Sequence, residues 1–205
     1  MSAYPFGASK ERIVVTGGPG AGKTAVLELA RREFCRHVTI LPESASIVFS
    51  GGFPRHRDDV ARRAAQRAIH YVQRELETIA LSREQVRVAL CDRGTIDALA
   101  YWPGPWAEFF GDIRSTMEAE LARYSAVIHL RVPENAAMYR ASEIRLESHQ
   151  EALEIDRRLL EVWSGHPRRI LVDGSDDFVL KAERALAGIR AELPNCCASA
   201  EPCAR

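Results

Sequence analysis

The sequence has no net charge, because 28 acidic residues balance 28 basic ones. A surface of uniform sign, which typifies general nucleic-acid or membrane binding, is therefore not expected. No apolar run approaches the roughly 20 residues that a bilayer span needs, and the first residues, MSAYPFGASKER, lack the apolar centre of a signal peptide. We therefore expect a cytoplasmic protein with no membrane partner.

Cysteine and lysine are both scarce. None of the five cysteines forms a C-x-x-C pair, which argues against a zinc site, and three of them lie in the tail NCCASAEPCAR. The 205 residues suffice for one sizeable core, so we expect a single domain over residues 1–192 and a disordered tail over residues 193–205. Only three of the 28 basic residues are lysines, which marks Lys23 as chemically required.

A glycine-rich stretch, GGPGAGKT, runs from Gly17 to Thr24 directly after the apolar segment IVVTG. It fits the pattern G-x-x-x-x-G-K-[ST], in which successive backbone N–H groups and the start of a helix bind phosphate. Lys23 is expected to bridge the β- and γ-phosphates of ATP, and the Thr24 hydroxyl to bind Mg²⁺. The predicted nucleotide-binding residues are Gly18, Pro19, Gly20, Ala21, Gly22, Lys23, Thr24 and Ala25.

Short apolar segments alternate with amphipathic ones along the whole chain. The predicted strands are 13–16, 38–41, 86–91, 126–132 and 169–172. The predicted helices are 23–34, 58–81, 95–101, 112–124, 149–163 and 176–191. This alternation predicts a three-layer α/β/α fold of the phosphate-loop class, with a five-stranded parallel sheet.

Acidic residues follow two of the predicted strands. Ligands of open parallel sheets bind beyond the carboxyl ends of the strands, so Glu43 and Asp92 are expected to face the same crevice as Lys23. Asp92 is the predicted Mg²⁺ ligand together with Thr24, and Glu43 is placed to accept the proton of an attacking hydroxyl, a role that Asp92 could also take. Arg93 could contact Glu43 or a substrate phosphate.

From Arg12 to about Arg190 the chain resembles the small AAA-type phosphate-loop domains of the NadR-like group, which includes ribosylnicotinamide kinase domains. The residues that carry the resemblance are GGPGAGKT, PESA, CDRGTIDALAY and YRASEIRLESHQEALEIDRRLLEVW. Glu43 followed by Asp92-Arg93 also resembles the deoxynucleoside kinases, in which an acid after the second strand is the base and the arginine belongs to a DRS-like motif. Here Gly94 stands in place of that serine.

The resemblance implies a helical lid after the fourth strand. Arg140 and Arg145 would then be catalytic cations that offset charge on the transferred phosphoryl group, with Arg157 and Arg158 as weaker candidates. If the segment is helical, Arg140 could instead pair with Glu143 on the surface.

The remaining candidates have competing interpretations. Trp102, Trp106 and Phe53 could stack on a flat ring, but large aromatics beside prolines more often fill a core edge. In the helix over residues 58–81, the predicted apolar face is Val60, Ala64, Ala68, Val72, Leu76 and Ile79, which leaves Arg62, Arg63, Arg67 and Arg74 in solvent. The histidines show no ligand spacing and are given no role.

Taken together, these patterns predict an ATP- and Mg²⁺-dependent kinase that phosphorylates a hydroxyl of a small, nucleoside-like acceptor. The alternative is a nucleotide-dependent switch or binding protein, which the absence of a base-specificity motif leaves open. A polynucleotide 5′-end is a third possible acceptor, supported by the basic stretch RHRDDVARRAAQR and opposed by the neutral net charge.

Overall fold

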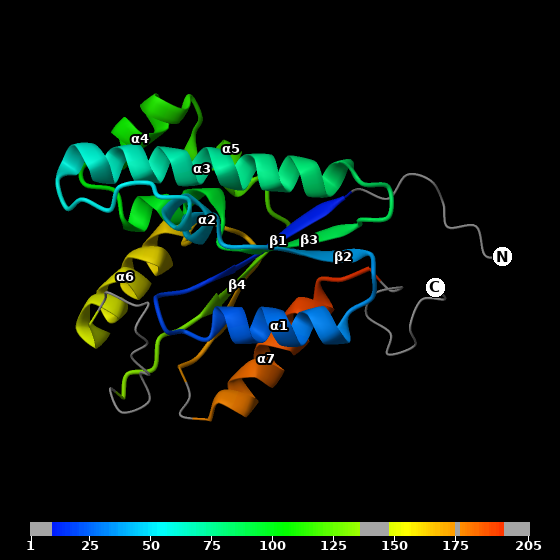
Figure 1. The fold of residues 1–205 in the computed structure, drawn as a ribbon. Helices are drawn as coiled ribbons and strands as arrows, with labels where there is room; N and C mark the ends of the chain where they lie inside the picture. The colour runs from blue at the N-terminus through cyan, green and yellow to red at the C-terminus, as the bar shows by residue number, and fades with distance from the viewer. Residues whose placement is uncertain (1–9, 136–147, 175–176, 195–205) are drawn as a thin grey trace.

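A computed structural model describes residues 10–135, 148–174 and 177–194 of the chain. Five strands form one parallel sheet in the order β2-β3-β1-β4-β5 (Figure 1). Their bounds are β1 Glu11–Thr16, β2 Val38–Leu41, β3 Val88–Asp92, β4 Ala126–Leu130 and β5 Arg169–Val172. The five-stranded parallel sheet predicted from the alternating pattern is thus confirmed.

Helices cover both faces of the sheet. α1 (Lys23–Glu33) and α7 (Phe178–Ala191) lie together on one face, and α3 (Asp59–Ser82) crosses the other (Figure 1). The second face also carries the 3₁₀ helix η1 (Thr95–Ala100), which packs between α3 and α6 (His149–Val162). The remaining helices are α2 (Ser44–Ser50), α4 (Trp106–Ile113) and α5 (Met117–Leu121).

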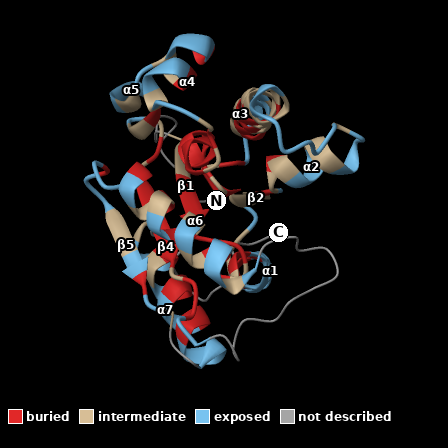
Figure 2. Cartoon of the chain, turned by 90° about the vertical axis from the view of Figure 1, so that its left-hand side faces the viewer, coloured by how far each residue is buried: buried red, intermediate tan, exposed pale blue. Residues whose placement is uncertain are grey.

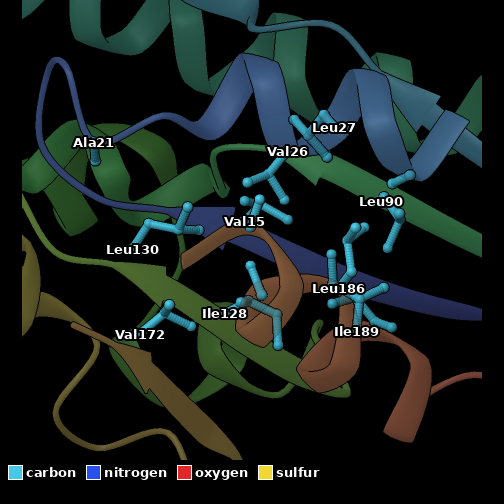
Figure 3. Close-up of a cluster of buried hydrophobic side chains, with 14 of the residues drawn as sticks. Val15, Ala21, Val26, Leu27, Leu90, Ile128, Leu130, Val172, Leu186 and Ile189 are labelled. Carbon is cyan, nitrogen blue, oxygen red and sulfur yellow. The ribbon is translucent and has the colours of Figure 1, made fainter. Parts of the chain in front are cut away.

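The three central strands, β3, β1 and β4, are buried on both faces, so their side chains contribute to two cores. Ile13 and Val15 of β1 point into a cluster with α1 and α7, part of which Figure 3 shows, whereas Val14 points into a cluster with α3, η1 and α6. Buried residues gather on the strands and on the helix faces turned toward them (Figure 2). No helix among the described residues is long and apolar enough to cross a membrane.

Two of the predicted elements differ in the structure. A single helix was expected over residues 112–124, but the chain forms α4 and α5, with Arg114 in the left-handed conformation (φ 53°) between them. Residues 44–50 were given no element and form α2, which begins directly after Glu43.

The predicted solvent-facing side of α3 is also wrong. Val60 and Ile79 are exposed, whereas His70 and Glu77 are buried, because α4 and α5 pack on the side that carries the arginines. Arg63 pairs with Glu108 of α4 at 2.5 Å, and Arg74 with Glu120 of α5 at 3.3 Å. The arginine row of α3 therefore pairs with α4 and α5 while its side chains stay partly exposed.

The topology brings three chain segments to one edge of the sheet. β1, β3 and β2 are neighbours and parallel, so the segments that follow them meet at their carboxyl ends. β1 leads into the phosphate loop, β2 into Glu43, and β3 ends on Asp92.

Candidate active site at the phosphate loop

The glycine-rich loop joins β1 to α1 with backbone angles that other residues rarely adopt. Gly17, Gly20 and Gly22 have φ values of 136°, 78° and 93°. A Cβ at Gly17 would lie 2.0 Å from the Leu130 carbonyl oxygen, so glycine is required there for the loop to rest on β4. No side chain caps the first turn of α1, which leaves its N–H groups available to a phosphate.

Lys23 is buried at the start of α1. Its ammonium group donates hydrogen bonds to the carbonyls of Gly17 and Gly18, at 2.9 and 3.1 Å. Burial and the nearby Arg93 guanidinium lower the pKa of Lys23 to about 8, although Asp92 and Glu43 act in the opposite direction. Thr24 and Ala25, the next residues of the helix, are exposed.

Asp92 ends β3 beside Lys23 and is only 8% exposed. Its Oδ1 atom is buried with no hydrogen-bond partner in the described part of the chain. Burial raises the pKa of Asp92, which Lys23 partly offsets. A buried carboxylate oxygen without a donor is suited to a cation or to a water bound to one, so Asp92 together with the exposed Thr24 hydroxyl fits Mg²⁺.

Glu43 and Arg93 form an ion pair across the ends of β2 and β3. Arg93 Nε lies 2.6 Å from Glu43 Oε1, and Ser46 of α2 donates to Glu43 Oε2, also at 2.6 Å. Burial of Glu43 opposes ionisation, but the charge of Arg93 and the hydrogen bond from Ser46 outweigh it and lower the pKa of Glu43 to about 2. Glu43 is thus ionised at neutral pH and held in place.

Arg93 itself has a left-handed backbone, with φ 75°. This conformation is uncommon for a residue with a long side chain and persists only where the surroundings enforce it. Its N–H donates to the Val15 carbonyl at 3.1 Å, which ties the turn after β3 to β1. The strained turn aims the guanidinium at Glu43 and at the start of the phosphate loop, where Gly17 O lies 3.5 Å from Nη1.

Asp97, on η1, is a site residue that the sequence analysis missed. Its Oδ2 atom accepts hydrogen bonds from Thr16 at 2.7 Å and from Arg93 Nη1 at 3.3 Å, while Oδ1 accepts from the Trp163 indole at 2.8 Å. Asp97 thereby connects the end of β1, the Arg93 turn and α6. Its position only four residues after Arg93 is the one sequence signal that points to it, although Arg93 itself lies before η1.

A cavity of about 550 Å³ opens beside Glu43 and Arg93, between α2, α3 and η1. Phe49, Gln66 and Tyr101 contribute an aromatic and amide lining, and Arg55 and Arg57 lie at its side in the loop that precedes α3. The lining is both polar and apolar, and its residues Arg93 and Asp97 connect the cavity to the start of the phosphate loop and to Thr16 before it.

The aromatic residues singled out from the sequence lie elsewhere. Trp102 is buried and packs edge-to-face on Phe109, with ring centroids 5.1 Å apart, and Trp106 packs partly buried against the same core. Neither residue lines the cavity, nor does Phe53, so Phe49 and Tyr101 take the place expected for them.

The proposed lid cations cannot be placed, because Arg140 and Arg145 lie outside the described residues. Of the two weaker candidates, Arg158 donates to the carbonyls of Leu99 and Trp102 at 3.4 and 3.2 Å, and so closes the end of η1. Arg157 pairs with Glu154 on the surface of α6. Both arginines have structural partners in this arrangement.

Comparison with known proteins agrees with the fold and the loop. A family model described as "AAA domain" matches residues 12–179. The structure of deoxyadenosine kinase from M. mycoides with bound dATP is similar with a TM-score of 0.59 and 15% identity, over 87% of this chain and 98% of that one. Thymidylate kinase from Candida albicans is similar with a TM-score of 0.63 and 14% identity, over 90% of this chain and 92% of that one.

At such identities the two structures establish the fold, and the family rests on the model match. No curated protein matches the sequence significantly. The chain therefore belongs to this AAA-domain family, and it has the fold of the phosphate-loop kinases.

Proposed function

We propose that the protein is an ATP- and Mg²⁺-dependent kinase that transfers the γ-phosphoryl group to a hydroxyl of a small, nucleoside-like acceptor. The observation that carries this proposal is the ionised Glu43, paired with Arg93 at one wall of a ligand-sized cavity, beside Lys23 of the phosphate loop. A hydrolytic switch needs no carboxylate at the wall of a separate acceptor site, whereas a kinase needs one to orient its acceptor hydroxyl.

The nucleotide side of the proposed site is built from the phosphate loop. The N–H groups at the start of α1 and the Lys23 ammonium would bind the β- and γ-phosphates, with Lys23 exchanging its contacts with Gly17 and Gly18 for phosphate oxygens. Thr24 and Asp92 would hold Mg²⁺ or its bound water. When bound, the metal neutralises charge on the phosphates.

Glu43 would accept the hydrogen bond of the acceptor hydroxyl and finally its proton. The pairing with Arg93, which keeps the pKa of Glu43 at about 2, also makes this carboxylate a weak base. Arg93 Nη1 already lies near Gly17 of the phosphate loop, so a bound phosphate would compete with Glu43 for the guanidinium. Nucleotide binding would thereby raise the basicity of Glu43 when the acceptor needs it.

The cavity supports an acceptor of nucleoside size. Its volume of about 550 Å³ lies within the range of about 300–1,000 Å³ typical of small-molecule sites. Phe49 and Tyr101 line the cavity with aromatic surface, and Gln66 of α3, which is 9% exposed, offers an amide that can donate and accept hydrogen bonds.

The proposal is tested by ADP release from Mg·ATP in the presence of single acceptors: nucleosides, nicotinamide riboside, nucleoside monophosphates and a 5′-hydroxyl oligonucleotide. Strong stimulation by one acceptor is expected, with the phosphorylated product identified by mass spectrometry. Lys23→Ala serves as the blank, since it removes the phosphate contact and should abolish turnover. Tight nucleotide binding without stimulation by any acceptor would favour the switch instead.

A further inference from the structure

The carboxylate of Asp156, in the middle of α6, is fully buried against the start of the phosphate loop. Its Oδ1 atom accepts the Gly18 N–H at 3.0 Å and lies 2.9 Å from His129 Nε2. Its Oδ2 atom accepts from Arg131 Nε at 2.7 Å and from the Val132 N–H at 3.4 Å. The carboxylate therefore joins the loop to the end of β4 through four contacts.

This carboxylate is ionised despite its burial. Burial alone would raise the pKa of Asp156, but the hydrogen bonds from His129 and Arg131 outweigh it and lower the pKa. An ionised acceptor makes stronger hydrogen bonds than a neutral one, so the contact with the Gly18 N–H is one of the firm attachments of the loop. The cost of burying the charge is offset only while all its donors stay in place.

Residues of α6 and of the segment after β4 also pack closely against Gly18. A Cβ at this position would lie 2.6 Å from Val132 Cγ2, 2.7 Å from the Ala152 carbonyl oxygen and 3.0 Å from Asp156 Cβ. The backbone of α6 and the end of β4 thus press directly on the loop. Position 18 is a variable position of the G-x-x-x-x-G-K-[ST] motif, so the packing against α6 and β4 is the reason why this chain needs glycine there.

We propose that Asp156 is a positioning residue that anchors the phosphate loop to α6 and β4 and so keeps it in the shape that binds nucleotide. The anchor uses the N–H of Gly18 and leaves those at the start of α1 for phosphate. A loop that is already ordered does not lose further conformational entropy when nucleotide binds, so the anchor raises affinity. This inference rests on nucleotide binding by the loop and not on the identity of the acceptor.

The test is Asp156→Asn, which keeps the size of the side chain but places an NH₂ group against either the Gly18 N–H or Arg131. ADP affinity is measured by calorimetry at a temperature at which both proteins are folded by circular dichroism. We expect the Kd for ADP to rise about tenfold or more, the scale of losing one hydrogen bond to a charged group. The kcat with the best acceptor should fall too, because the γ-phosphate is no longer held in line.

The matched control is Glu77→Gln, which neutralises another fully buried carboxylate. Glu77 binds Arg12 at 3.1 Å and also Arg123; Arg12 lies near the start of β1, whereas the loop follows the other end of that strand. Glu77→Gln should lower the free energy of unfolding about as much as Asp156→Asn does. It should leave the Kd for ADP within about twofold of that of the original protein. This comparison separates loop positioning from general stabilisation.

A second variant, Gly18→Ala, attacks the same contact from the loop and should also weaken ADP binding, because the added methyl group must push the loop away from α6. If Asp156→Asn does not fold, an unchanged ADP affinity in Gly18→Ala still overturns the inference. Unchanged ADP affinity in the folded variants would overturn the inference and leave the kinase proposal standing. Failure of the original protein to bind any nucleotide would overturn both.

Discussion

Arg93 Nε lies 2.6 Å from Glu43 Oε1, although the two residues are 50 positions apart in the chain. The contact exists because β2 and β3 are adjacent parallel strands, which end side by side and release Glu43 and Arg93 at the same edge. A third residue, Asp97, holds the other side of the guanidinium at 3.3 Å. Glu43 therefore owes its orientation and its low pKa to the sheet topology.

Glu43→Gln tests the role of this carboxylate. Loss of a positioned proton acceptor should lower kcat by about 10²- to 10⁴-fold. The Kd for ADP should stay nearly unchanged at neutral pH, because the hydrogen bonds of Glu43 among the described residues go to Ser46 and Arg93 and not to the loop. Steady-state kinetics measures kcat, and calorimetry measures the Kd for ADP. Ser46→Ala, which removes only the hydrogen bond to Glu43 Oε2, is the milder control. Equal loss of ADP binding in Glu43→Gln would indicate a role in metal binding or folding.

The grouping of Glu43, Asp92 and Arg93 near Lys23 could be predicted because it depends on strand ends alone. Once alternating segments indicate a parallel sheet, every residue that follows a strand is assigned to the same edge. The electrostatic contacts among Lys23, Asp92, Arg93 and Glu43 bear this out. The roles proposed for these residues, including the metal role of Thr24 and Asp92, remain predictions.

Other features depend on tertiary packing that local patterns do not encode. The sequence pattern predicts one apolar face on α3, but α3 packs against α2, α4, η1 and the sheet, and Glu77 is buried with Arg12 and Arg123 while Val60 is exposed. Asp156 reads in sequence as one more charge on an amphipathic helix. Its partner Gly18 is 138 positions away, so only the folded chain reveals the contact.

The pKa of Lys23, at about 8, makes nucleotide binding pH-dependent. Bound phosphates favour the charged ammonium and so raise its pKa in the complex. The contribution of this charge to ADP affinity is therefore fully present below pH 8 and is lost as the pH rises above it. The Kd for ADP should rise by up to about tenfold per pH unit in that range. Calorimetric titration with ADP between pH 7.5 and 9.5 measures how the Kd changes with pH. Because phosphate ionises near pH 6, its own titration does not contribute in this range.

Lys23→Arg is the control for this titration, because a guanidinium keeps its charge over the whole range. Its affinity should be lower at every pH, as the longer planar group fits the loop poorly, but the slope should disappear. A flat profile in the original protein up to pH 9.5 would contradict the assignment of the titrating group.

Gly94 departs from the serine of the DRS-like motif for a steric reason. A Cβ there would lie 2.6 Å from Trp163 Cζ2 and 3.0 Å from Val14 Cγ2, and Trp163 is fixed by its hydrogen bond to Asp97. Gly94→Ala should therefore lower the free energy of unfolding by about 1–3 kcal/mol, as overpacking of a core does. It should also lower kcat, because a displaced Trp163 disturbs Asp97 and, through it, Arg93.

Urea unfolding measures this change, with Gly111→Ala as the matched control. A Cβ at Gly111 meets nothing within 4 Å, and the residue lies inside α4, where alanine is the better helix former. The control should be neutral or more stable by up to about 1 kcal/mol. Similar stabilities of the two variants would show that Trp163 can move without cost.

The position of Arg55 and Arg57 beside the cavity predicts which acceptors the protein favours. Arg55 lies 4.2 Å over the Phe49 ring, and Arg57 faces the charge of Glu151, but neither forms an ion pair among the described residues. Exposed cations beside a cavity attract an anionic group. If the acceptor hydroxyl lies at Glu43, a phosphate elsewhere on the same molecule would be held by these arginines, so a nucleoside 3′-monophosphate should have a lower KM than its nucleoside.

Replacing both arginines by alanine should raise the KM of the phosphorylated acceptor by about three- to tenfold, as expected for two exposed charges, and leave that of the nucleoside within about twofold. The comparison is repeated at high salt, which should reduce the difference because screening weakens exposed charges. Arg31→Ala combined with Arg32→Ala, on the exposed side of α1, controls for the loss of net charge. An equal rise in KM for both acceptors would mean that the loop only shapes the cavity, and the acceptor would then be sought among uncharged molecules.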